Sequence, residues 1–136
     1  MNRITKMVPA AIGISGLALA SLAAVGSAPA SAAATCQLTV HSNKVLNLEE
    51  DNGTDSIFFK LGNNRTPTLN YALGDKQVNI GSETFQGSID LKVFEKNGNQ
   101  RTLVDRLNNI PCQNSPVQVD DATDGDAIYR VRWSVQ

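Results

Sequence analysis

The sequence contains a single histidine, which excludes several kinds of catalytic site. His41 has no second histidine to act with it, so neither a histidine-based zinc site nor a two-histidine mechanism is available. No Gly-x-Ser-x-Gly segment occurs, and the usual strand-to-helix turn of a serine hydrolase is therefore not indicated. Aromatic residues make up only 5% of the chain, so a glycosidase with an aromatic sugar platform is not indicated either. We expect the protein not to be an enzyme.

An excess of basic residues is also lacking. The chain has 12 Lys and Arg against 13 Asp and Glu. Two of the basic residues, Arg3 and Lys6, belong to a segment that we expect to be removed, which leaves a net charge of about −3. Binding of nucleic acid through its phosphates needs a clustered excess of Lys and Arg. We therefore expect no nucleic-acid partner.

The first 34 residues have the composition of an export signal. The two basic residues precede an apolar core over residues 8–25, and overlapping small-x-small cleavage sites follow over residues 28–34. A membrane anchor is the alternative, but the segment is rich in Gly, Ala and Ser and leads directly into the cleavage sites. We expect a signal peptide over residues 1–34 and a secreted, extracellular domain over residues 35–136, with no membrane span after cleavage.

The two cysteines, Cys36 and Cys112, both lie in the expected mature domain. Outside the cytoplasm an even number of cysteines usually indicates a disulfide, and only one pairing is possible here. Lipid attachment at Cys36 is the alternative, but the preceding Ala33-Ala34-Thr35 lacks the pattern expected before a lipid-bearing cysteine. We expect a Cys36–Cys112 disulfide that closes a loop around most of the domain.

The dominant hydrophobic period of the mature chain is two. Ile57, Phe59 and Leu61 alternate with polar or variable positions, and residues 127–135 alternate most clearly of all. Turn residues such as Asn-Gly and Gly-Asp recur between these segments, so the sequence predicts an all-β sandwich or barrel. The expected strands cover residues 37–48, 56–61, 68–72, 77–80, 88–93, 102–107, 117–119 and 127–135.

If every connection reverses the chain, successive loops alternate between the two ends of the sandwich. This count places one set of loops together, at residues 49–55, 74–75, 96–101 and 120–126. We call this the acidic end, because most carboxylates fall there. The other loops, with both cysteines, fall at the opposite end. The count depends on residues 102–107 forming a reversing strand, and a single helical turn is the alternative there.

Gathered carboxylates repel one another, and a bound cation relieves the repulsion. Ca²⁺ suits such loops because it accepts six to eight oxygen ligands in flexible geometry. The segment Asp120–Asp126 lacks the closing Glu of an EF-hand, so no compact loop motif is matched. Solvated acidic turns are the alternative, since Asp, Asn and Gly favour turns for local backbone reasons.

Four parts of the chain resemble small secreted actinomycete β-proteins, few of which have an assigned activity: Cys36, residues 50–60, residues 87–95 and residues 129–133. These proteins are similar to C2-type sandwiches, so the resemblance implies a single antiparallel β-sandwich, C2-like or immunoglobulin-like. By the same resemblance, Ca²⁺ sits among Asp-bearing loops at one end. The residues that would hold it are Asp51, Asp55, Asp121, Asp124 and Asp126. Residues 96–99 depart from the pattern, because an acidic loop is expected there.

Together these observations predict a secreted, non-catalytic β-sandwich that acts as a binding or interaction module, with Ca²⁺ as a candidate stabilising ion. Its expected partner is an extracellular protein or polysaccharide. The outward Arg130 and Arg132 are the candidate contacts for an acidic partner or polysaccharide, with an ordinary exposed polar strand face as the alternative. The loop at residues 96–101 is the candidate contact of a protein-binding module such as an inhibitor. Two alternatives stay open: an inhibitor of an extracellular hydrolase, and a small extracellular hydrolase that uses loop carboxylates.

Overall fold

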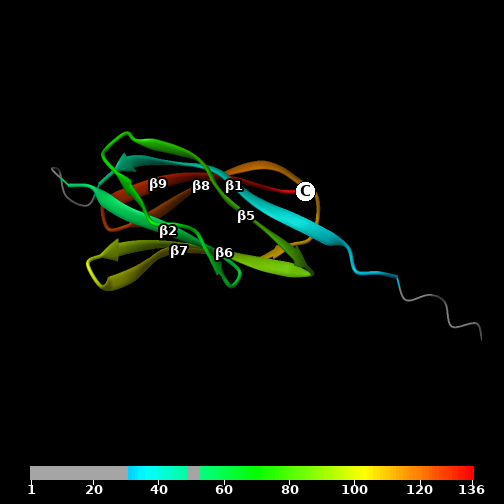
Figure 1. Cartoon of the computed structure of the whole chain (residues 1–136). Helices are drawn as coiled ribbons and strands as arrows, with labels where there is room; N and C mark the ends of the chain where they lie inside the picture. Colours follow the sequence, from blue (N-terminus) through cyan, green and yellow to red (C-terminus); the bar gives the residue numbers. More distant parts are fainter. Residues whose placement is uncertain (1–30, 49–52) are drawn as a thin grey trace, which may run out of the picture. The chain divides into compact units, whose positions relative to one another are not determined.

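The computed structural model describes residues 31–48 and 53–136 (Figure 1). All of its strands belong to the compact unit Ala32–Gln136. They are β1 (Thr35–Asn47), β2 (Asp55–Leu61), β3 (Asn64–Arg65), β4 (Leu69–Tyr71), β5 (Lys76–Gln86), β6 (Ser88–Asn97), β7 (Gln100–Pro111), β8 (Ser115–Asp124) and β9 (Ala127–Val135).

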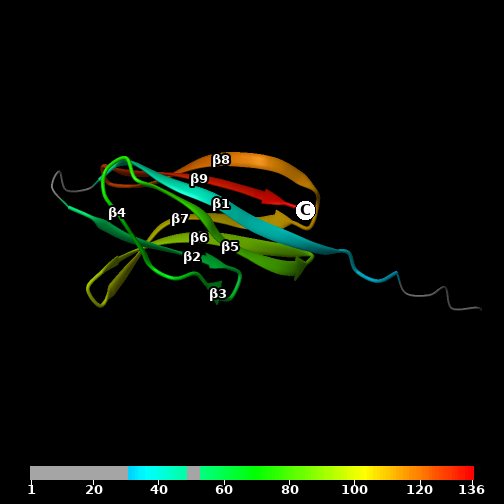
Figure 2. The same ribbon diagram turned by 45° about the horizontal axis from the view of Figure 1, so that its top comes forward.

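The strands form two antiparallel sheets that face each other (Figures 1 and 2). Sheet A has the order β5-β1-β9-β8. Sheet B has the order β3-β2-β6-β7, and β4 continues the pairing of β3 along β2. This arrangement confirms the predicted all-β sandwich.

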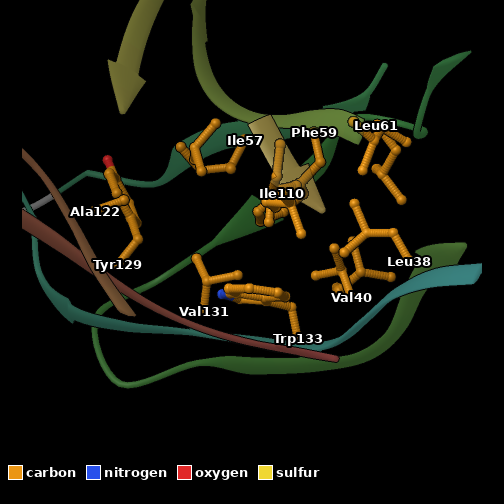
Figure 3. Packing of buried hydrophobic residues seen from close by; sticks show 14 of the residues in the cluster. Leu38, Val40, Ile57, Phe59, Leu61, Ile110, Ala122, Tyr129, Val131 and Trp133 are labelled. Carbon is orange, nitrogen blue, oxygen red and sulfur yellow. The ribbon is translucent and has the colours of Figure 1, made fainter. Parts of the chain in front are cut away.

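The core lies between the sheets and follows the period of two. Ile57, Phe59 and Leu61 of β2 point towards Val131 and Trp133 of β9 (Figure 3). In an antiparallel sandwich the alternate residues of each strand share one face, so burying these side chains fixes which residues point to solvent. On β2 the outward residues are therefore Ser56, Phe58 and Lys60.

The long first strand β1 is irregular at its middle. The register of β1 against both of its neighbours shifts between Val40 and Ser42, which places a β-bulge at His41. A second shift, between Val45 and Asn47, occurs against β9 alone.

Four strands are longer than the alternation predicted. One is the central strand β6, which continues to Asn97. The other three are edge strands. β5 continues to Gln86 through residues expected as a loop, β7 continues to Pro111, and β8 includes Asp120 to Asp124. The predicted loops at residues 81–87, 108–116 and 120–126 are therefore too long. All three strands lie at sheet edges and carry many exposed side chains, so their apolar alternation is weak although their backbones are paired.

The loops nevertheless alternate between the two ends as counted. The connections at residues 72–75, 98–99 and 125–126 lie at the end where β1 stops, and Gly87 and residues 112–114 lie at the other. Residues 102–107 are part of β7, so the reversing-strand interpretation was correct. Residues 49–52 lie outside the part that the structure describes.

The predicted disulfide is present. Cys36 on β1 is bonded to Cys112, which follows β7, and the two Cα atoms are 5.3 Å apart. The bond joins sheet A to sheet B at the end opposite the β8–β9 turn. It closes a loop of 76 residues in sequence separation.

We expect the double variant Cys36→Ala/Cys112→Ala to lose roughly 4 to 5 kcal/mol of unfolding free energy, because a loop of this length restricts the unfolded chain strongly. The measurement is the urea midpoint of the oxidised protein against the variant. A reductant should lower the midpoint of the parent protein and leave that of the variant unchanged. Equal midpoints for parent and variant would show that the bond does not stabilise the fold.

Candidate functional site

The carboxylates that the sequence assigned to Ca²⁺ are not all free to bind a cation. Asp51 lies outside the described residues. Asp55 begins β2 with 7% of its surface exposed, and the buried Tyr129 hydroxyl donates a hydrogen bond to its Oδ2 over 2.5 Å. This carboxylate therefore has a donor within the protein and faces the interior of the sandwich.

Asp121 also has a partner. Arg130, its register neighbour on β9, donates from Nε and one terminal nitrogen to the two carboxylate oxygens, each over 2.8 Å. The hydrogen bonds from Arg130 lower the pKa of Asp121, and the positive charge of Arg130 lowers it further. The pair occupies the outward face of sheet A.

The remaining two candidates lie at the β8–β9 turn. Asp124 is half-buried at the end of β8, and Asp126 is exposed in the turn. Because β8 continues to Asp124, the alternation of side chains puts Asp121 and Asp124 on opposite faces of the strand. The structure does not bring these two carboxylates together.

Within residues 31–48 and 53–136, no group of three or more His, Cys, Asp or Glu side chains is placed to hold a metal ion. Asp120, which the sequence also placed at the acidic end, lies further along β8 and accepts a hydrogen bond from the Trp133 indole over 2.6 Å. The described carboxylates thus fit a Ca²⁺ site poorly as a set, although the predicted site itself stays a prediction.

A histidine–serine pair is present on sheet A. His41 Nε2 lies 2.7 Å from Ser134 Oγ, at the bulge of β1. Only 3% of Ser134 is exposed, so this residue is shielded from solvent. Neither cysteine offers a thiol, because both are in the disulfide.

The feature that distinguishes the surface is a line of basic side chains across sheet B. Arg65 of β3 is paired with Lys60 of β2, Lys60 with Lys92 of β6, and Lys92 with Arg106 of β7. Directly paired residues share a face and lie side by side, so four cations from four neighbouring strands point outward together. We call Arg65, Lys60, Lys92 and Arg106 the basic row.

The basic row has little compensating charge. Like charges directly opposite one another on a sheet destabilise it. Asp90 is the one acid paired with the row among the described residues, and its carboxylate lies 3.6 Å from Lys92 Nζ. The pKa of Asp90 is lowered, first by the Asn109 backbone N–H that donates to it and then by Lys92 and Arg106.

Sheet A carries a shorter basic line. Lys76, Lys44 and Arg130 are in register on β5, β1 and β9, and the line ends at Asp121, which pairs with Arg130. Arg132, also exposed on β9, has no acidic partner among the described residues either, so three of the four cations of sheet A, Lys44, Lys76 and Arg132, lack an ion pair. Of the ten Lys and Arg in the described residues, six point outward from sheet B: the basic row together with Lys96 and Arg101.

An aromatic pair lies next to the basic row and contacts one of its members. Phe58 of β2 and Phe94 of β6 are paired in register and stack with their ring centroids 5.0 Å apart. The Arg65 guanidinium lies over the Phe58 ring, 3.8 Å from its centroid, and also donates to Thr68 Oγ1 over 2.8 Å. Although Phe58 points outward, only 1% of it is exposed, because Arg65 and Phe94 cover it.

This site was not predicted from the sequence. Lys60 and Lys92 alternate with core residues on their strands, which is the available signal, but the pairing register that lines them up is a tertiary property. Arg65 lies on the two-residue strand β3, which no expected strand covered.

Comparison with known proteins supports the fold. No family model matches the chain, and no curated protein matches it. The solved structure titled "Structure of a C2 domain" is similar with a TM-score of 0.50 and 10% identity, over 74% of this chain and 98% of that one. This likeness shows the fold alone: the chain is a C2-like β-sandwich.

A second similar structure is titled "Human GIVD cytosolic phospholipase A2 in complex with Methyl gamma-Linolenyl Fluorophosphonate inhibitor and Terbium Chloride". Its TM-score is 0.46 at 10% identity, over 74% of this chain and 17% of that one, and it carries no argument here. Within the described residues, no helix is long and apolar enough to cross a membrane.

We expect Arg130→Ala to raise the pKa of Asp121 towards its ordinary value of 3.8, because the first cause of the lowering is removed. Because the pKa of Asp121 is lower in the folded protein than in the unfolded chain, the ion pair stabilises the fold at any pH above the unfolded-state pKa. This stabilisation is lost as the pH falls through the folded-state pKa. Both side chains are more than a third exposed, so solvent screening keeps the loss of unfolding free energy small. Carboxyl NMR titration measures the shift, and an unchanged pKa would contradict the pairing.

Proposed function

We propose that this protein is an exported, non-catalytic binding module that presents the outer face of sheet B to an anionic partner. The basic row carries the proposal. Four cations held in register on neighbouring strands cost stability in isolation, and a bound anion offsets that cost. A partner with several negative charges can engage more than two of them at once.

The extracellular setting is supported by two features. The disulfide between Cys36 and Cys112 is compatible with an oxidising compartment. Residues 1–34 have the basic start, apolar core and small-residue run of an export signal. The absence of catalysis is supported by the burial of Ser134 and the bonding of both cysteines.

Inhibition of an extracellular hydrolase is a second candidate function. The β6–β7 hairpin supports it, because its tip at residues 97–101 is exposed and its base carries the register pair Lys96 and Arg101. Such an inhibitor would form a stoichiometric complex through the hairpin, and Lys96→Glu/Arg101→Glu would weaken it. Hydrolysis by loop carboxylates would instead be lost on replacing Asp121 and Asp124 by Asn.

We expect the protein to be retained by a sulfonate cation-exchange resin at pH 7 despite its net negative charge. At about 50 mM salt, charges within roughly 10 Å of each other still interact, whereas more distant charges are screened. The resin therefore interacts with the local line of cations more strongly than with the distant acidic residues. The variant Lys60→Glu/Lys92→Glu should lose retention.

The matched control is Lys44→Glu/Lys76→Glu, which makes the same change of charge at a register pair on sheet A. It should keep most of the retention. Equal loss in the two variants would show that net charge, and not the face of sheet B, governs binding. Melting curves of both variants confirm that each is folded.

The calcium prediction now depends on Asp124 and Asp126, together with Asp51, because Asp55 and Asp121 have partners in the protein. If this prediction is correct, about 1 mM Ca²⁺ should raise the melting midpoint of chelator-treated protein, because a ligand that binds only the folded state stabilises that state. The rise should vanish in Asp124→Asn/Asp126→Asn. An unchanged midpoint would contradict calcium binding and leave the anion-binding proposal untouched.

A further inference from the structure

We propose that the partner of the basic row is a linear acidic polysaccharide that lies across the strands of sheet B. This inference rests on the proposed function and names the chemistry of the ligand. Three properties of the face support it: the line formed by the charges, the apolar row beside them and the fixed position of Arg65.

The four residues form a line across the strands, and the Arg65 guanidinium leans from this line over Phe58. Each member of the basic row comes from a different strand, in the spatial order β3-β2-β6-β7. Neighbouring strands are about 4.8 Å apart, so the row runs perpendicular to the strands for roughly 14 Å. A single small anion can contact only neighbouring members. An extended chain that carries a carboxylate on each sugar can contact several members of the row at once.

An apolar row lies directly beside the basic row. Phe58, Phe94 and Leu103 are in register across β2, β6 and β7, two residues along the strands from Lys60 and Lys92. Leu103 is 42% exposed and Phe94 is half-buried, so the middle and far part of this row can be reached by a ligand. A sugar ring has a C–H face as well as charged and hydroxyl edges, and it matches a surface that is apolar beside a line of cations.

This combination favours a polysaccharide over the other polyanions. Binding of single-stranded nucleic acid uses open aromatic faces on which bases stack, whereas Phe58 is covered by Arg65 and stacks on Phe94. Inorganic polyphosphate has no apolar surface to place against Leu103. Insertion into a lipid bilayer needs projecting apolar side chains, and Leu103 is the one large hydrophobic residue on this face with more than a third of its surface exposed.

The position of Arg65 is set before a ligand arrives. Its guanidinium is held over Phe58 at 3.8 Å and bonded to Thr68 at 2.8 Å. Ordering a long side chain on binding costs conformational entropy, and a side chain that is already ordered avoids that cost. Arg101, paired in register with Lys96, reaches back over the apolar row, where its guanidinium carbon lies 5.9 Å from the Phe58 centroid, and it adds positive charge there.

The test uses polygalacturonate as the acidic polymer and its fully methyl-esterified form as the neutral polymer with the same backbone. Isothermal titration should show binding of the acidic polymer alone. The monomer, galacturonic acid, should bind far more weakly, because it cannot span the row. Lys60→Glu/Lys92→Glu should weaken binding about tenfold or more, since each reversed charge replaces an attraction with a repulsion, and Lys44→Glu/Lys76→Glu should not.

A second variant separates the polysaccharide from general anion binding. Leu103→Ser removes an exposed apolar side chain without changing charge, so it should weaken binding to polygalacturonate and leave retention on the sulfonate resin unchanged. Retention on the resin without binding to polygalacturonate would overturn this inference alone. Loss of both would overturn the proposed function as well. Preferential binding to phosphatidylglycerol vesicles or to DNA would also overturn the inference, because either would show a different class of ligand.

Discussion

The antiparallel register of β2 against β6 is the constraint on which the rest of this surface depends. It buries Ile57 and Phe59 between the sheets, and by the same alternation it places Lys60 opposite Lys92 on the outside. A shift of one residue would turn every side chain of β2 to the other face and would expose the core. The burial of apolar side chains therefore holds two lysines together against their mutual repulsion. The pairings of β3 and β7 then extend this line to four cations.

The aromatic pair helps to offset the repulsion between the cations of the basic row. Phe58 and Phe94 point away from the core, but they stack on each other, and the Arg65 guanidinium covers Phe58. The interaction between a cation and an aromatic face stabilises the arginine in a position that charge repulsion alone would disfavour. On sheet A the corresponding line is relieved in a different way, because Arg130 is paired with Asp121. Within the described residues, each sheet thus has one cation paired with an acid, Lys92 with Asp90 on sheet B and Arg130 with Asp121 on sheet A, and sheet B carries the larger number of cations.

Much of the fold could be predicted from local sequence, and the site could not. The alternation of Ile57, Phe59 and Leu61 shows directly which face of a strand is buried, and the single pair of cysteines allows only one disulfide. The edge strand β8 was harder, since the run of Asp120 to Asp126 has the composition of a turn and yet is mostly paired with β9. That pairing separates Asp121 from Asp124. The basic row depends on which strands are neighbours and in which register, and no local pattern contains that information.

The central claim is that anions bind along the row of Arg65, Lys60, Lys92 and Arg106. Backbone amide chemical shifts, followed while polygalacturonate is titrated into the protein, test it most directly. The account predicts that the shifts concentrate on β3, β2, β6 and the paired part of β7 and spare β1, β5 and β9. Shifts confined to the loops at residues 72–75 and 125–126, or to sheet A, would contradict it.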